Sequence, residues 1–215
     1  MLQDLIKKRR SVRLFNGKKV PREDILSIIE AGTWAPTGCN NQELRFLVLD
    51  DEKDIGEFIK FKPFFKGIST VILVFCDMSL PLSKMYHEKA SRSLQFIDTG
   101  LALENMVLYA KSLGIDSCVV NLSEYHFGQR EASLIKKIIK QIKIVFGLHA
   151  SSKNNFEFFL RNYIRIGGNF KIMAGVVFGY AGREPDINKE MHGGKKIMRE
   201  KVDHYIIHKG RSDNG

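Results

Sequence analysis

The sequence predicts a layered α+β domain, and three observations favour that class. Helical and strand patterns are both present, but they do not follow the strict βαβ alternation of a doubly wound sheet. The 215 residues can bury a core without disulfide support. A composition of 44% hydrophobic and 27% charged residues is typical of globular proteins, and no repeat or compositional break divides the chain. We therefore expect a single domain over residues 1–215.

Helices are expected wherever apolar residues recur at three- and four-residue spacing. Pro21 suits the first turn of one helix, and Gly32 suits its end. The strongest pattern covers residues 91–113, whose apolar residues lie on more than one face, as in a helix at a protein centre or an interface. The expected helices are 1–10, 21–32, 51–59, 91–113, 130–145 and about 199–208.

Strands are expected at residues 45–49, 70–76, 116–121 and 171–180. The second of these is a continuous apolar and β-branched run, which is typical of a buried central strand. Residues 147–169 combine loop formers with aromatic residues. Loops of this length inside a domain are usually functional or disordered. We expect the aromatic residues either to fill a small satellite core or to close as a lid over a binding site.

The charge and the cysteines limit the possible functions. Lys and Arg total 34 against 24 Asp and Glu, a formal net charge of +10, which attracts nucleic acid, anionic membrane or a phosphorylated cofactor. No apolar run approaches the ~18 residues of a membrane span. The N-terminus lacks a secretory apolar core, so a cytoplasmic location is expected. The sparse cysteines Cys39, Cys76 and Cys118 predict free thiols rather than a disulfide framework or a zinc site.

The first candidate site is the basic segment Arg9, Arg10, Ser11, Val12 and Arg13. Each guanidinium presents a fork of donors that matches a phosphate, and the serine hydroxyl adds another donor. From the residues alone, a solvated charged face is the more common explanation. The segment therefore predicts an anion site only in combination with other features.

The second candidate site is the loop from Pro36 to Gln42, which includes Thr37, Gly38 and Asn40. Small residues let backbone N–H groups approach a ligand, and side-chain amides both donate and accept. The alternative is an ordinary turn between a helix and a strand. A third basic segment, with Lys195 and Lys196 after two glycines, lacks the phosphate-loop pattern, and a flexible tail is its more common explanation.

Other catalytic patterns are missing from the sequence. His204 and His208 have metal-ligand spacing, but the glutamate of an HExxH motif is absent, so no metal is expected. The GxSxG and GxGxxG motifs are absent as well. Cys39 has no neighbouring histidine in sequence that would activate it as a nucleophile.

The order of these pieces resembles the FMN-dependent nitroreductase family. The resemblance rests on the basic segment at 9–13, the loop at 35–42, the long helix containing 101–106, the segment 113–118, the strand ending at Tyr180 and the lysines at 195–196. It spans roughly residues 1–122 and 171–200. Two departures are Glu43, where many members have proline, and Asn121, where an acidic residue is common. Residues 123–170 have no counterpart in the family pattern and are expected to be an atypical insertion.

The resemblance implies a nitroreductase-like layered sandwich, with a mixed, mostly antiparallel sheet flanked by helices, that forms an intertwined homodimer. It implies FMN as the cofactor, NAD(P)H as the electron donor and a small acceptor such as a nitroaromatic, a quinone or an enone. Arg9, Arg10 and Ser11 would hold the FMN phosphate and ribityl chain, with Arg13 near the flavin ring. The remaining residues implied to bind the cofactor are Pro36, Thr37, Gly38, Asn40, Val119, Asn121, Leu122, Lys195 and Lys196.

The leading hypothesis is therefore an FMN-dependent oxidoreductase without a protein nucleophile, in which donor and acceptor use one site in turn. The alternative is a basic binding module for nucleic acid or an anionic membrane. Its best feature is the lysine-rich face of the helix expected at 130–145. A surface helix packed on the core explains the same pattern, so nucleic-acid binding is the less favoured hypothesis.

Overall fold

The computed structural model describes residues 2–80, 88–122, 160, 163–182 and 205. The chain divides into two compact units, residues 1–183 and residues 184–215. The second unit is described only at Tyr205, which is exposed, so the fold below is that of the first. The helices expected at 130–145 and 199–208, most of the expected insertion, and Lys195 and Lys196 lie outside the described residues. The single domain stays a prediction.

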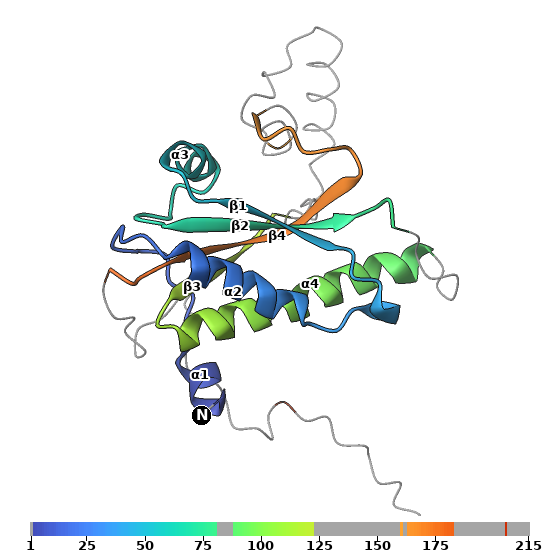
Figure 1. Ribbon diagram of the computed structural model, residues 1–215, viewed down its shortest axis with the longest axis horizontal. Coiled ribbons are helices and arrows are strands. Elements are labelled where there is room, and N and C mark those ends of the chain that lie inside the picture. Colours follow the sequence, from blue (N-terminus) through green and yellow to red (C-terminus); the bar gives the residue numbers. More distant parts are fainter. Residues whose placement is uncertain (1, 81–87, 123–159, 161–162, 183–204, 206–215) are drawn as a thin grey trace, which may run out of the picture. The chain divides into compact units, whose positions relative to one another are not determined.

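The sheet of the described chain has four strands: β1 (Leu44–Leu49), β2 (Thr70–Asp77), β3 (Asp116–Asn121) and β4 (Phe170–Gly179). Their order is β1-β2-β4-β3, and each neighbouring pair is antiparallel (Figure 1). β2 is paired on both sides and buried along nearly its whole length, which confirms the expected central strand. In the described part of the chain, parallel pairing occurs only as isolated bridges, Ser11 to Ser117 and Leu14 to Lys66.

Helices cover both faces of this sheet (Figure 1). The described α-helices are α1 (Leu2–Lys8), α2 (Arg22–Thr33), α3 (Glu52–Phe61) and α4 (Glu88–Ser112), and the last three cover the sheet, whereas α1 contacts α4. The pair α2 and α4 packs on one face, and α3 lies on the other. Pro21 is the N-cap of α2 rather than its first residue. Asp51 caps α3 by accepting the backbone N–H of Asp54, as an N-terminal aspartate should. The layered α+β class is confirmed.

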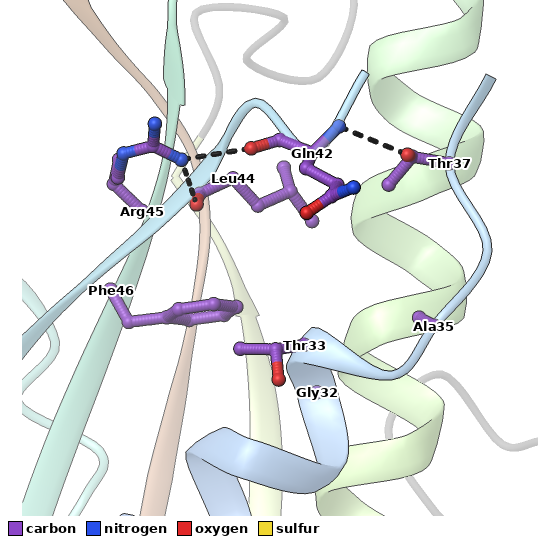
Figure 2. A pocket seen from close by; sticks show the side chains of 8 residues that line it. All are labelled: Gly32, Thr33, Ala35, Thr37, Gln42, Leu44, Arg45 and Phe46. Atoms are coloured by element: carbon purple, nitrogen blue, oxygen red, sulfur yellow. Dashed lines mark hydrogen bonds between the residues drawn. The ribbon is translucent and has the colours of Figure 1, made fainter. Parts of the chain in front are cut away.

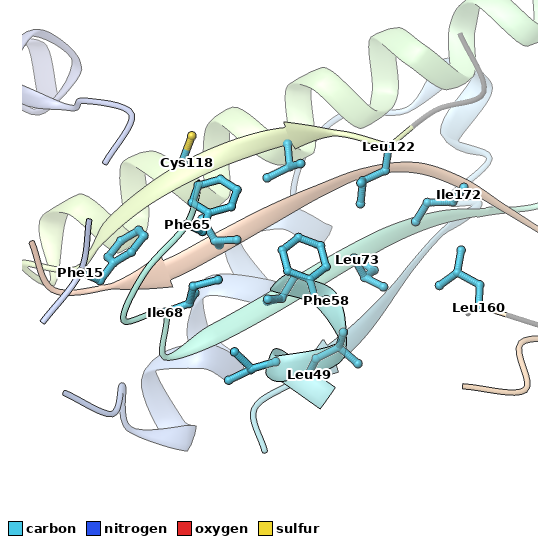
Figure 3. Packing of buried hydrophobic residues seen from close by; sticks show 14 of the residues in the cluster. Phe15, Leu49, Phe58, Phe65, Ile68, Leu73, Cys118, Leu122, Leu160 and Ile172 are labelled. Carbon is cyan, nitrogen blue, oxygen red and sulfur yellow. The ribbon is translucent and has the colours of Figure 1, made fainter. Parts of the chain in front are cut away.

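Alternation along β2 divides the core into two halves, because successive side chains of a strand point to opposite faces. Val71, Leu73 and Phe75 belong to the half beneath α3, together with Phe58 and Phe65 (Figure 3). Residues of the other parity pack beneath α2 and α4. The members of that second half include Ile25, Ile28, Ile72, Val74, Leu103, Met106, Ala110, Val176 and Phe178.

A bulge in β4 lets one strand serve both halves. Val74 pairs with Ala174 but Phe75 pairs with Ile172, so Met173 is one extra residue on the β4 side. A one-residue insertion reverses which face each later side chain occupies. Ile172 therefore lies in the α3 half and Ala174 in the α4 half, although both positions are even-numbered.

The long helix α4 is apolar on two faces, as its sequence predicts. Its buried face carries Ala102, Met106 and Ala110 against the sheet. A second set of large apolar side chains is exposed in the single chain. These are Phe96, Ile97, Leu101 and Tyr109, followed by Leu113 just after the helix.

The end of the segment expected at 147–169 belongs to the core. Leu160 is 2% exposed, and Ile164 and Ile166 pack against the α3 half. The Tyr163 ring lies near the Lys53 ammonium of α3, with 5.5 Å between the nitrogen and the ring centroid. These described residues favour the satellite core over the lid. Phe156, Phe158 and Phe159 lie outside the described residues.

Candidate functional site

The basic segment lies along the start of β3. The backbone N–H of Val12 donates to the carbonyl of Ser117 at 2.9 Å, and Ser11 bridges the same residue. Val12 and Phe15 are buried and anchor the segment, whereas Arg9 and Arg13 stay half-buried. Isolated bridges from Ser11, Leu14 and Phe15 hold this segment against its neighbours. It presents the basic groups at the edge of the sheet.

Arg10 carries an unsatisfied donor. Its Nη1 donates to the carbonyls of Lys7 and Arg9, the second at 2.8 Å. Its Nε is buried and has no hydrogen-bond partner among the described residues. A buried donor without a partner carries a desolvation cost that an anionic ligand would remove. Arg13 is oriented in a similar way, because its Nη1 donates to the Ser11 carbonyl at 3.1 Å.

The expected Val119 and Asn121 lie further along β3, and Leu122 directly follows the strand. Val119 is 46% exposed and Asn121 is exposed, whereas Leu122 is 5% exposed and faces the core. Cys118 lies within electrostatic reach of Arg13 and Arg9. Burial nevertheless raises the pKa of the Cys118 thiol, with Arg13 acting in the opposite direction. The structure therefore brings the basic segment to the start of the strand that carries Val119 and Asn121.

The loop from Pro36 to Gln42 contains a short 3₁₀ turn, Gly38–Asn40. Cys39, Asn40 and Gln42 have positive φ angles of 53°, 54° and 51°. The turn is closed by Asn40 N–H donating to the Thr37 carbonyl at 2.9 Å, and Gln42 N–H donates to Thr37 Oγ1 at 3.0 Å (Figure 2). Pro36 and Asn40 are exposed. The loop is thus a defined turn that presents polar groups outward.

Gly38 brings this loop close to α4. A methyl group placed on Gly38 would lie 3.1 Å from Leu94 Cδ1, so a glycine allows the approach. The Gly38 N–H donates to both carboxylate oxygens of Asp98, each at 3.1 Å. The loop is therefore tied to the N-terminal half of α4 through one backbone amide.

A cavity of about 180 Å³ lies on another side of the loop (Figure 2). The Arg45 guanidinium closes it by donating to the carbonyls of Gln42 and Leu44, both at 2.9 Å. Trp34, which directly follows α2 and is 80% exposed, does not line this cavity. The residues lining the cavity are Gly32, Thr33, Ala35, Thr37, Gln42, Leu44, Arg45 and Phe46.

Within one chain the loop and the basic segment are far apart. The basic segment is bridged to Ser117, which follows the C-terminal end of α4. The loop is tied to Asp98 near the other end of the helix. At a rise of about 1.5 Å per residue, Asp98 lies roughly 20 Å along α4 from Ser112. The two predicted halves of the cofactor site are not brought together in one chain.

Glu43 and Asp98 are features that the sequence analysis missed. Their side chains are 2% and 3% exposed, and burial raises the pKa of Glu43. One signal was present in the sequence, because Asp98 is an isolated carboxylate within an otherwise apolar stretch of helix. The contact between them joins a loop to a distant helix, which a local pattern does not reveal.

Metal and membrane sites have no support in the described residues. In that part of the chain, no group of three or more His, Cys, Asp or Glu residues is arranged to hold a metal ion. Among the same residues, no helix is long and apolar enough to cross a membrane.

The chain belongs to the nitroreductase family, whose family model matches residues 6–143. It is similar to the iodotyrosine deiodinase of Thermotoga neapolitana, at 33% identity over 112 residues, 39% of this chain and 60% of that protein. It is also similar to an Archaeoglobus fulgidus protein provisionally named NADH dehydrogenase/NAD(P)H nitroreductase, at 31% identity over 116 residues, 53% of this chain and 63% of that protein. The chain thus matches less than two thirds of the length of these relatives.

Solved structures share the fold at low sequence identity. An FMN-dependent nitroreductase from Clostridium difficile R20291 has a TM-score of 0.63 at 17% identity, covering 96% of this chain and 98% of that one. A nitroreductase family protein from Clostridium difficile 630 has a TM-score of 0.64 at 20% identity, covering 98% and 99%. The nitroreductase-like fold is therefore confirmed.

Proposed function

We propose that this protein is an FMN-dependent NAD(P)H oxidoreductase. The observation that carries the proposal is the unsatisfied, buried Nε of Arg10, in a segment that resembles the family's phosphate-binding segment and lies within the matched residues 6–143. A phosphate carries close to two negative charges near neutral pH and accepts several hydrogen bonds, so it suits this donor set. The names of relatives that mention FMN and NAD(P)H support the same cofactor and donor.

The residues present fit the cofactor. Arg9, Arg10 and Ser11 would hold the phosphate end, and the contribution expected of Lys195 or Lys196 stays a prediction from the sequence. The half-buried guanidinium of Arg13 would favour negative charge on the ring system, since a cation stabilises a nearby anion. When bound, FMN accepts a hydride from NAD(P)H and passes its electrons to a second substrate at the same position.

A second copy of the chain would complete the site. The exposed apolar face of α4 is suited to a partner, and a helix that is apolar nearly all round is usually covered. Because the loop and the basic segment lie at different ends of α4, a two-fold dimer would set the loop of one subunit against the basic segment of the other. Pro36, Thr37, Gly38 and Asn40 would then bind the cofactor across the interface.

The proposed acceptor is a small planar molecule, such as a nitroaromatic, a quinone or an enone. Iodotyrosine belongs in the panel of acceptors, because one relative is named for its deiodination. The backbone and the exposed Val119 of β3 would border the acceptor position, where an apolar surface excludes water.

Stopped-flow kinetics on the FMN-loaded protein tests this function. NADH or NADPH should bleach the flavin absorption under anaerobic conditions, and at least one acceptor should restore it with ping-pong steady-state kinetics. FMN-loaded protein that neither nucleotide reduces would contradict the oxidoreductase proposal. The nucleotide that reduces it faster identifies the preferred donor.

A further inference from the structure

Two buried carboxyl groups meet beneath the Thr37–Gln42 turn. Glu43 ends the loop and is 2% exposed, and Asp98 on α4 is 3% exposed. The Asp98 carboxyl lies within hydrogen-bonding reach of Glu43. Asp98 also receives the Gly38 N–H on both of its oxygens at 3.1 Å. A single chain of contacts therefore runs from Glu43 through Asp98 to the backbone of the loop.

Two carboxylates in contact and shielded from water cannot both be ionised at low cost, so one of them retains a proton. The Gly38 N–H stabilises negative charge on Asp98. Burial, followed by the Asp98 contact, raises the pKa of Glu43. Glu43 is therefore the member of the pair that would carry the proton, with its O–H directed at the Asp98 carboxyl. No described N–H or O–H group donates to Glu43 Oε2, which leaves that oxygen free to carry the proton.

The titratable and hydrogen-bonding groups around Glu43 come from the loop, β2 and β4. Within the loop, hydrogen bonds from the Glu43 backbone and from the Asn41 side chain to the Glu43 carboxyl favour its charged form and oppose the effect of burial on its pKa. From β2, Asp77 N–H donates to the Glu43 carbonyl at 2.9 Å, and hydrogen bonds from Ser79 keep the pKa of the Asp77 carboxyl low. Cys76, also on β2, has its pKa raised by burial to about 12, so its thiol stays neutral. Lys171 on β4 is the described cation near this thiol.

We propose that the Glu43–Asp98 pair shares one proton and thereby positions the Thr37–Asn40 loop for cofactor binding. Both are positioning residues, because they act through the Gly38 backbone rather than on a ligand. The inference rests on the proposed function, in which this loop contacts FMN. The shared proton would make FMN affinity depend on pH through the loop, an effect that the basic segment alone would not produce.

The direction of the pH effect follows from the raised pKa of Glu43. Below that pKa the pair holds one proton, Asp98 accepts from Gly38, and the loop keeps its shape. As the pH rises through it, a second buried negative charge repels Asp98 and weakens its hold on Gly38. FMN affinity should therefore fall as the pH rises.

The test compares FMN dissociation constants across the pH range in which the protein stays folded, in three proteins: wild type, Glu43→Gln, and Glu23→Gln as a control. An amide at position 43 donates to Asp98 at every pH, and Glu23 is exposed on α2. Wild type and Glu23→Gln should lose affinity progressively as the pH rises, by about tenfold or more across that range. Glu43→Gln should change far less, and any titration of FMN itself cancels in the comparison.

Equal pH dependence in wild type and Glu43→Gln would overturn the proposal. Two measurements made without FMN test the shared proton independently of the proposed function. Hydrogen exchange of the Gly38 amide, corrected for intrinsic rate, should accelerate at high pH in wild type but not in Glu43→Gln. Infrared spectra of wild type alone should contain a protonated carboxyl band that disappears as the pH rises, and its absence would overturn the shared proton even if the variant failed to fold. If the protein binds no FMN but gives the expected hydrogen-exchange and infrared results, the proposed function is contradicted and the shared proton is not.

Discussion

At the scale of single residues, Arg10 is the residue that most directly indicates an anion site. Its Nη1 is engaged by backbone carbonyls while its buried Nε is unpaired among the described residues. The sequence made this segment a candidate because three guanidiniums in five residues suit a phosphate. It did not reveal Glu43 or Asp98, since their roles arise only where the loop meets α4. It also did not single out Trp34, whose exposure depends on the end of α2.

Replacing Arg9 and Arg10 together by alanine should weaken FMN binding at least about tenfold. Each lost charge-assisted hydrogen bond is worth roughly 1.5–3 kcal/mol. The matched control is Lys7→Ala with Lys8→Ala, which removes the same charge from exposed neighbours and leaves the Lys7 carbonyl in place. Fluorescence titration with FMN measures both. Equal losses in the two double variants would assign the effect to net charge rather than to this site.

The positions of the helices and strands were the most predictable part of this fold. Strands β1 to β4 and helices α2, α3 and α4 lie within a few residues of the expected ranges, because hydrophobic periodicity reports burial directly. The bulge at Met173 was not predictable, since it depends on which partner strand each residue meets. The N-terminal segment also escaped an element assignment. It is held to the sheet by isolated bridges and by tertiary contacts.

Gly67 fixes that N-terminal segment, and its replacement should destabilise the fold. It has a φ of +66°, and a Cβ there would lie 2.3 Å from the Phe15 carbonyl oxygen. Gly17 is the matched control, because its φ is +81° but a Cβ there would meet nothing within 4 Å. Gly67→Ala should lower the free energy of unfolding by more than about 1 kcal/mol, and by more than Gly17→Ala. Urea denaturation followed by circular dichroism measures the difference, and equal losses would refute the steric clash.

The exposed face of α4 makes oligomeric state the central question at the scale of the whole molecule. Ile97 and Leu101 are 55% and 42% exposed on a helix whose opposite face is fully buried. We predict a homodimer with a mass about twice 24.6 kDa by sedimentation at micromolar concentration. Aspartate at both positions should give monomers that bind FMN weakly.

Leu26→Asp is the control for that experiment, because Leu26 is similarly exposed, at 53%, but lies on α2. It should leave the dimer intact. A wild-type monomer that binds FMN tightly would refute both the dimer and the loop's contribution across the interface.

The most direct test of the central claim is the absorption spectrum of the purified protein with the cofactor that it releases on denaturation. We expect a yellow protein with a flavin spectrum that releases about one FMN per chain, or a colourless one that gains that spectrum on titration with FMN. Protein that is colourless and does not bind added FMN, while binding nucleic acid with an affinity that falls steeply with salt, would contradict it.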